Sequence, residues 1–219
     1  MLDFNFISKI LFLLPLLVPI FGQVTRPGVC PNVRTQPGFD LNRYLGQWYE
    51  SEKFFFIPEI GLRCNSALYT LNGNGAVSVV NSGIETSTGM VRSVTGTAIS
   101  TSAVEPGRLV VQFTPFTPPG QYWVLDTDYE SYSVVYSCRQ QGLQRIESAF
   151  ILTRERSGLP AATRIQLYSK LLASGINAYD FIPTDQTSCP VLSPFQPFQP
   201  PPVTIPGMQI IPPATELFV

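Results

Sequence analysis

The sequence predicts an all-β domain, either a sandwich or an up-and-down barrel, followed by one α-helix. Eight short runs of strand-like composition follow one another between residues 47 and 153, and turn signals separate them. The strongest of these signals is Asn72-Gly73-Asn74-Gly75, because Asn-Gly pairs favour tight hairpins. A hydrophobic leader and four widely spaced cysteines further indicate a protein of an oxidising compartment.

The strands are expected in a fixed order along the chain. A short helical turn over residues 39–45 precedes them, and a helix starting near Pro160 follows. In that helix the spacing predicts one apolar face made of Ile165, Tyr168, Leu171 and Leu172. The expected strands are 47–54, 63–71, 76–81, 91–100, 108–113, 121–126, 131–138 and 145–153.

Two end segments are expected to lie outside the folded domain. Residues 1–22 are interpreted as a signal peptide, because Ile10–Phe21 is a 12-residue apolar run and a membrane span needs about 20 residues. Residues 193–219 hold eight prolines among 27 residues and are expected to be extended or disordered. This tail is either inert or a docking segment. The folded domain is therefore expected over residues 23–192.

Composition excludes several classes of function. Only 13% of the residues are charged and the net charge is −1, so the chain has no electrostatic footprint for nucleic acid. Histidine is absent, which excludes Ser-His-Asp and Cys-His catalysis and histidine-ligated metal sites. We expect neither a cofactor nor a metal site.

The four cysteines predict two disulfides. Cys30, Cys64, Cys138 and Cys189 are far apart and form no CxxC motif, which argues against a zinc knuckle or a thioredoxin-type motif. An even number of cysteines in an oxidising compartment favours disulfide pairing. The residues alone leave three connectivities open.

Two motifs frame the strand region. Residues 39–54 read FDLNRYLGQWYESEKF, with Gly46 two residues before Trp48. Residues 126–138 read DTDYESYSVVYSC and contain Thr127-Asp128-Tyr129. Both motifs are weak singly, so their order and spacing carry the argument.

A third motif completes a family pattern. Residues 149–155 read AFILTRE, in which Arg154 is the basic residue of the motif. The three motifs in this order, with eight strands and a following helix, resemble the lipocalin family. Within it, "CPN", "YLGQWYE", "TDYESYSVVYSC" and "TDQTSCP" are similar to the apolipoprotein D group with its insect relatives. The resemblance covers residues 30–192 and leaves out the tail.

The resemblance implies an eight-stranded antiparallel up-and-down barrel with the helix packed outside. One end of such a barrel is closed, and a ligand cavity opens at the other. The implied disulfides are Cys30–Cys138 and Cys64–Cys189. Trp48 would fill the floor, Arg154 would stack on its ring in a cation–π contact, and Gly46 would leave room for close backbone approach.

Strand alternation and the resemblance together predict which residues line the cavity. Cys138 must face outward to reach Cys30, so Val135 faces inward. Arg154 must reach Trp48, which turns Phe150 inward on the last strand. The predicted lining is aromatic and uncharged, offers two phenol hydroxyls and suits a small lipophile. It consists of Ala67, Tyr69, Val111, Phe113, Tyr122, Val124, Val135 and Phe150.

Features near the predicted mouth have two interpretations each. Phe54-Phe55-Phe56-Ile57-Pro58 would form a lid or an interaction patch, or else fold over and fill the mouth. Arg63 or Lys53 would pair with a fatty-acid carboxylate, although a solvated surface charge is the more ordinary role for each.

The leading functional hypothesis is a secreted carrier, monomeric or weakly oligomeric, of a small hydrophobic ligand such as a fatty acid, a sterol or retinoid, or a bilin. Some lipocalins isomerise prostaglandins through a free thiol, but all four cysteines here match disulfide positions, so we expect no enzyme. The alternative is an extracellular scaffold that docks through residues 54–58 and the proline-rich tail, with contact to a lipid particle or membrane surface.

Overall fold

The structure is a computed structural model that describes residues 23–190, except 74, 114 and 117. The expected leader over residues 1–22 and the tail over residues 193–219 lie outside the described residues. Within the part that is described, no helix has the length and apolar character needed to span a bilayer.

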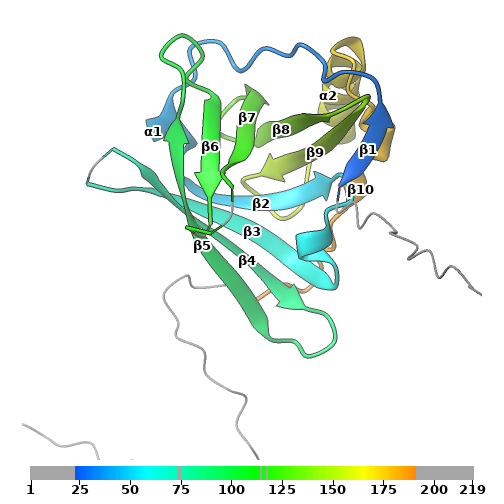
Figure 1. Ribbon diagram of the computed structural model, residues 1–219. Coiled ribbons are helices and arrows are strands. Elements are labelled where there is room, and N and C mark those ends of the chain that lie inside the picture. Colours follow the sequence, from blue (N-terminus) through cyan, green and yellow to red (C-terminus); the bar gives the residue numbers. More distant parts are fainter. Residues whose placement is uncertain (1–22, 74, 114, 117, 191–219) are drawn as a thin grey trace, which may run out of the picture.

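Eight antiparallel strands form a closed barrel in sequence order (Figure 1). Each strand pairs with the next, and the last pairs with the first, so the sheet has no free edge along most of its length. Closure confirms the predicted up-and-down barrel and excludes a sandwich. The strands are β2 (Gly46–Lys53), β3 (Leu62–Leu71), β4 (Val77–Glu85), β5 (Val91–Ser100), β6 (Arg108–Gln112), β7 (Gly120–Thr127), β8 (Tyr132–Gln141) and β9 (Gln144–Thr153).

Short elements flank the barrel. Strand β1 (Val24–Pro27) adds to β9, and β10 (Ile182–Pro183) adds to β2. The helical turn α1 (Leu41–Tyr44) precedes β2. The remaining elements are η1 (Ile57–Glu59) between β2 and β3, then α2 (Ala161–Ala173) and η2 (Ala178–Asp180) after β9.

Side chains pack in two apolar layers, one inside the barrel and one between its outer wall and α2. Strand β8 shows the alternation that separates them: Val135 belongs to the inner cluster, whereas Val134 and Tyr136 belong to the outer one. The outer layer therefore holds the predicted helix against the barrel, which is the arrangement expected from the sequence.

The buried face of α2 differs from the predicted one. Leu167 and Leu171 are 2% and 4% exposed, whereas Ile165 is 66% exposed and Leu172 is 40% exposed. Leu171 and Tyr168 of the predicted face do contact the outer cluster, but the prediction missed Leu167. Residues four apart lie above one another on a helix, so Leu167 and Leu171 form the buried stripe. The apolar residues of this helix fit two overlapping faces, and contact with the barrel selects one of them.

Two disulfides tie flanking segments to the barrel. Cys30 is bonded to Cys138 on β8, and Cys64 on β3 is bonded to Cys189 near the end of the described chain. This is the pairing that the family resemblance implies. All four cysteines therefore form disulfides, and none is left as a free thiol.

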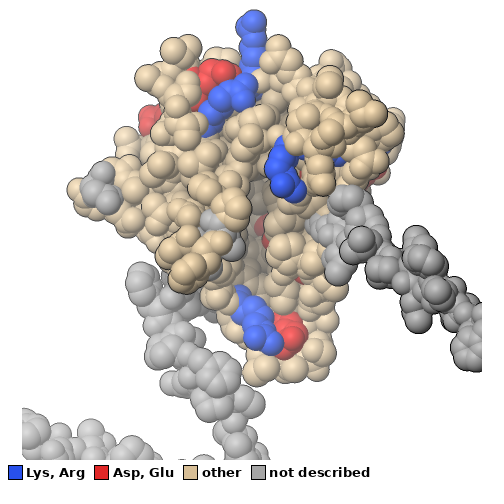
Figure 2. All heavy atoms as spheres, viewed as in Figure 1, with Lys and Arg blue, Asp and Glu red and all other residues tan. Residues whose placement is uncertain are grey.

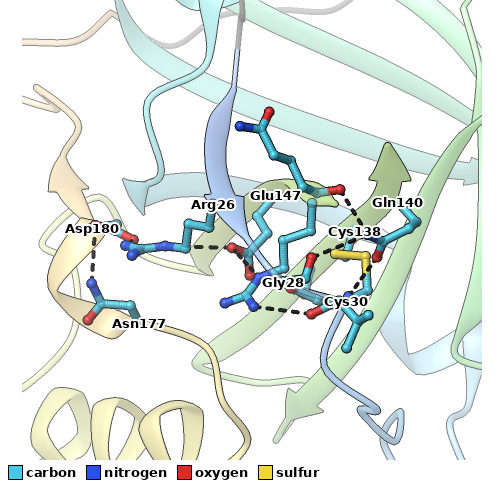
Figure 3. A network of polar contacts seen from close by, with 12 residues as sticks. Arg26, Gly28, Cys30, Cys138, Gln140, Glu147, Asn177 and Asp180 are labelled. Carbon is cyan, nitrogen blue, oxygen red and sulfur yellow. Dashed lines mark hydrogen bonds and ion pairs between the residues drawn. A yellow bond between two sulfur atoms is a disulfide. The ribbon is translucent and has the colours of Figure 1, made fainter. Parts of the chain in front are cut away.

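A polar network holds β1 beside the first disulfide (Figure 3). Glu147 on β9 is only 1% exposed and lies 2.9 Å from Nε of Arg145 and 3.6 Å from Nε of Arg26. Tyr136 donates a hydrogen bond of 2.6 Å to the same carboxylate, and Arg26 also pairs with Asp180 of η2. The buried charge is thus neutralised, and the network joins the first strand to the segment after α2.

Candidate functional site

The closed end of the barrel is built around Trp48. Its side chain is fully buried, and its indole N–H donates to the carbonyl of Tyr44 at 2.8 Å. The Arg154 guanidinium lies over the indole, 3.7 Å from the ring centroid. Arg154 also donates to the carbonyls of Gln47 at 2.8 Å and Leu45 at 2.9 Å. One cation therefore closes the floor and satisfies several backbone acceptors.

Gly46 is required by this arrangement. Its φ is +97°, and a Cβ at this position would lie 3.3 Å from Nη1 of Arg154. A larger residue would be strained by its backbone and would press on the guanidinium.

The Thr127-Asp128-Tyr129 segment shapes the turn beside this floor. The Thr127 hydroxyl accepts from the Tyr129 N–H at 2.9 Å, and the Tyr129 hydroxyl accepts from the Asp40 N–H at 2.9 Å. Partial burial acts to raise the pKa of Asp128, but hydrogen bonds from Ser131 and from backbone N–H groups hold that pKa below its usual range. These contacts indicate that the three residues orient the β7–β8 turn and the start of α1.

The structure brings all eight predicted lining residues together inside the barrel. Five of them are buried members of the inner cluster, and three are half-buried and packed against it. The half-buried three are Phe113, Tyr122 and Phe150. Their ligand-binding role remains a prediction. The cluster has further buried members outside the predicted lining, among them Tyr44, Val77, Val79 and Ala98.

Tyr44 is the most consequential of the missed residues. Its ring is 1% exposed and packs 5.2 Å from Trp48 and 5.5 Å from Tyr69, measured between ring centroids. Its hydroxyl lies 2.9 Å from those of Tyr122 and Ser133. Its position four residues before Trp48, at the end of an expected helical turn, was the only sequence signal for it.

A charged group lies on the inward side of β2, which corrects the expectation of an uncharged interior. Lys53 is 8% exposed, and its Nζ lies 3.0 Å from Glu50 and also pairs with Glu59. Asn65 donates to Glu50 at 3.1 Å and to Glu59 at 2.9 Å. Strand register sets Lys53 beside Phe150, a lining residue.

An irregularity in β2 explains why Lys53 is buried rather than solvated. The pairing with β9 shifts between Glu50 and Glu52, so two residues that strict alternation would separate both face inward. Glu52 instead faces outward and accepts a hydrogen bond from Tyr168 of α2. One extra residue thus reverses the orientation of every side chain after it, and local sequence does not reveal this bulge.

Burial and the neighbouring charges shift the pKa values of Glu59 and Lys53. Burial, and then the neighbouring Glu50 carboxylate, raise the pKa of Glu59 to about 8, although Lys53 acts in the opposite direction. Burial acts to lower the pKa of Lys53, but Glu50 and Glu59 outweigh it and raise that pKa above its usual value. Lys53 is therefore a cation already neutralised by its neighbours.

The segment after β2 has a mixed arrangement at the open end. Phe54 is buried in the outer cluster, 4.7 Å from Phe181, whereas Phe56 meets Phe150 edge-on at 5.4 Å. Phe55 is 47% exposed. The segment therefore partly covers the mouth and partly offers an apolar surface. Between it and the β6–β7 connection, the face is hollowed (Figure 2).

Arg63 does not reach the mouth. Its Nη1 donates to the carbonyl of Thr187 at 3.1 Å, beside the Cys64–Cys189 disulfide. It is consequently placed to hold the C-terminal segment rather than a ligand carboxylate.

Comparisons with known proteins agree with this architecture. A family model described as a lipocalin-like domain matches residues 39–186. Apolipoprotein D of Macaca fascicularis is 40% identical over 189 residues, which cover 84% of this chain and 98% of that protein. Lazarillo protein of Schistocerca americana is 36% identical over 146 residues, 64% of this chain and 68% of that protein.

Solved structures show the same fold. Insecticyanin from the tobacco hornworm Manduca sexta superposes with a TM-score of 0.65 at 28% identity, covering 75% of this chain and 89% of that one. Lobster apocrustacyanin A1 superposes with a TM-score of 0.66 at 21% identity, covering 78% and 94%, and shows the fold alone. The family model and the relatives leave one conclusion: this chain belongs to the lipocalin family.

Proposed function

We propose that the protein is a secreted carrier that binds a small hydrophobic ligand inside the barrel. The observation that carries the proposal is the partial exposure of three aromatic side chains inside the barrel. Phe113, Tyr122 and Phe150 pack against the inner cluster but are only half-buried. Aromatic side chains in this state border space that an apolar ligand can fill, and covering them is favourable. Membership of the lipocalin family and a closed floor at Trp48 support the same function.

Extracellular location and lack of enzymatic activity are part of the proposal. The two disulfides support an oxidising compartment, because such bonds persist mainly outside the cytosol. They also leave no thiol to act as a nucleophile. The candidate ligands remain fatty acids, sterols or retinoids, and bilins.

The first experiment is native mass spectrometry of the secreted full-length protein, followed by identification of any extracted molecule. A co-purifying lipid or pigment would support a carrier and reveal its ligand class. A mass without ligand, together with no fluorescence response to fatty acid, retinol or biliverdin, would contradict it.

The two tryptophans lie on different sides of the barrel wall, so a variant can restrict the fluorescence measurement to the interior. Trp48 lies on the barrel floor, whereas Trp123 packs against the outer cluster with Arg108 4.6 Å from its ring centroid. A Trp123→Phe variant therefore reports on the interior alone. A ligand in the barrel is expected to quench this variant, and quenching seen only when Trp123 is present would place the ligand elsewhere.

A second function, contact of the open end with a lipid surface, is favoured by a specific observation. Three connections at that end carry strongly exposed apolar side chains: Ile60 is 62%, Phe116 is 95% and Leu143 is 91% exposed. Most of the face around the hollow is also uncharged (Figure 2). An apolar rim of this kind suits a phospholipid surface from which a ligand is loaded. The tail of the scaffold alternative lies outside the described residues.

Vesicle flotation tests this contact. Binding to phosphatidylcholine vesicles is expected to fall in a Phe116→Ser/Leu143→Ser variant. Val104 is 91% exposed on the β5–β6 connection at the opposite end, so Val104→Ser is the matched control. Equal binding by both variants would contradict docking through the rim.

A further inference from the structure

Four hydroxyl groups form a continuous chain inside the barrel. The Tyr69 hydroxyl on β3 lies 2.8 Å from that of Tyr122 on β7, which lies 2.9 Å from that of Tyr44 on α1. Tyr44 in turn lies 2.9 Å from Oγ of Ser133 on β8. Residues from four separate elements thus meet at one deep polar point inside the barrel.

The chain of hydroxyl groups has one more O–H hydrogen than its hydrogen bonds use. Each hydroxyl carries one O–H, so the four groups supply four donors, whereas three contacts consume three. Within the described chain these hydroxyls have no other partner. One O–H is therefore left to donate out of the cluster, whichever way the chain is oriented. An unused donor is costly when a ligand excludes water from the cavity.

One end of the hydroxyl chain faces the space available to a ligand. Ser133 and Tyr44 are 0% and 1% exposed, and Tyr69 is 5% exposed. Tyr122 is half-buried, as are the neighbouring lining residues Phe113 and Phe150. The Tyr69–Tyr122 end of the chain therefore borders the open interior, and the Ser133 end is sealed.

The surroundings of the chain are unsuited to a negative charge. Burial raises the pKa of Tyr44 to about 12 and raises that of Tyr69 and Tyr122 well above the usual value, so all three stay neutral. The nearby cations are occupied: Arg154 is below the floor on backbone carbonyls, and Lys53 pairs with Glu50 and Glu59. A buried carboxylate would lack a free cation there.

Towards the rim of the described barrel, two exposed arginines carry positive charge in contact with solvent. Arg92 on β5 pairs with Glu85 at 3.2 Å and is 61% exposed. Arg139 on β8 is exposed and lies beside Ile146 in the strand register. An anionic group on a ligand is therefore accommodated at the mouth, in contact with solvent, and not at the hydroxyl chain.

We propose that the ligand enters the barrel with an uncharged end first, and that this end carries an acceptor oxygen. This oxygen accepts a hydrogen bond from the unused O–H at the Tyr69–Tyr122 end of the hydroxyl chain. The ligand class is a neutral lipophile with a terminal ketone, aldehyde or ester. This inference rests on the proposed carrier function and narrows its candidate ligands from three classes to one chemical pattern.

A matched pair of retinoids tests the inference. Methyl retinoate and retinoic acid share one polyene and differ in whether the end group is a neutral ester or an ionised carboxylate. We expect the full-length protein at pH 7.4 to bind the ester about tenfold more tightly, the ratio that one hydrogen bond and an uncompensated charge readily supply. Infrared spectra of ester carrying ¹³C at the carbonyl should show a lowered stretching frequency in the complex.

Variants assign the effect to the hydroxyl chain. In Tyr69→Phe/Tyr122→Phe the frequency shift should vanish and ester affinity should fall about five- to tenfold, whereas retinoic acid affinity should change less than about twofold. Tyr49→Phe is the matched control, because Tyr49 pairs with Thr153 on the outer face under Arg156 and should change neither quantity.

The outcomes separate this inference from the carrier proposal. Binding of both retinoids with equal affinity, or a carbonyl frequency unshifted in the wild-type complex, overturns the inference and leaves the carrier intact. A shift that persists in the double variant also overturns it. If the protein binds neither these retinoids nor fatty acid or biliverdin, the carrier proposal fails together with the inference.

Discussion

Arg154 joins distant parts of the chain at the closed end of the barrel. It stacks on Trp48 from β2 and donates to the carbonyls of Gln47, Leu45 and Tyr129, the last at 3.0 Å. A guanidinium is suited to this task because its donors point in several fixed directions within one plane. The same plane provides the contact with the indole.

Removing that side chain should destabilise the fold strongly. Arg154→Ala removes a cation–π contact of about 0.5–2 kcal/mol and leaves backbone carbonyls without donors, at about 1–3 kcal/mol. We expect urea denaturation to show a loss of about 2–4 kcal/mol in the free energy of unfolding. Arg156→Ala is the control, because Arg156 lies 4.2 Å from the Tyr49 ring centroid on the outer face. Equal losses in the two variants would contradict the floor role.

Glu59 makes stability depend on pH. Its pKa is raised to about 8 by burial and by Glu50, so the folded protein holds a proton that the unfolded chain releases near pH 4.5. Folded chains thus bind more protons between these values, and the free energy of unfolding should fall as pH rises from about 5 to 8. The contribution is complete below the lower value and absent above the upper one.

Denaturation curves at pH 5.5, 7 and 8.5 check this expectation. Glu59→Gln keeps the size of the side chain and cannot titrate, so the decline should be smaller in that variant than in the wild type. Identical slopes for the two proteins would show that another group causes the decline.

At the scale of elements, the contact between α2 and the barrel wall decides which side of the helix is buried. Leu167 and Leu171 insert into the outer cluster with Val134 and Ile151 of the barrel wall. Tyr168, one residue along, donates to Glu52 of β2. Two adjacent rows of the helix thus contact the barrel, whereas Ile165 lies 66% exposed on the far side.

A pair of substitutions distinguishes these faces. Leu167→Ala should cost about 2–5 kcal/mol, because it deletes buried methyl groups and leaves a cavity. Ile165→Ala should change the free energy of unfolding by less than about 0.5 kcal/mol, as is usual at an exposed position. Both values come from chemical denaturation of the full-length protein. A larger effect at Ile165 would contradict its position on the exposed side of the helix.

At the scale of the whole molecule, closure of the barrel creates an interior that the open end alone connects to solvent. The strand β9 pairs with β8 on one side and β2 on the other. Trp48, Tyr44 and Phe39 fill the lower part of this interior, and the remaining half-buried aromatic residues lie above them. A ligand bound there would contact strands from all around the barrel, so binding and global stability should be linked.

Ligand binding should therefore raise resistance to unfolding. At a free ligand concentration 100 times its Kd, the expected gain is about 2.7 kcal/mol, measured as a shift of the denaturation midpoint. Ala67→Phe should abolish the gain by filling the space beside Tyr69, because Ala67 is a small lining residue. Ala103→Phe, at an exposed position on the β5–β6 connection, is the control. A gain retained by Ala67→Phe would place the ligand outside the barrel.

Much of the predicted lining of the barrel could be derived from the positions of a few residues. The outward direction of Cys138 determined the orientation of β8, and the position of Arg154 determined that of β9. Both strands pair without interruption, so alternation assigned Val135 and Phe150 to the interior. The charged group at Lys53 was not predictable in this way, because it follows an irregularity between Glu50 and Glu52, next to residues of β2 that pair with both β9 and β10.

The sequence by itself determined the strand order, the motif residues of the closed end and the number of disulfides. These depend on short-range patterns: alternation, turn residues and the spacing of a few motifs. Tertiary structure decided which face of α2 is buried, that Lys53 is neutralised inside the barrel, and that Tyr44, Tyr69, Tyr122 and Ser133 share one chain of hydroxyls. Each of these depends on contacts between residues distant in sequence, and only the closed barrel brings such residues together.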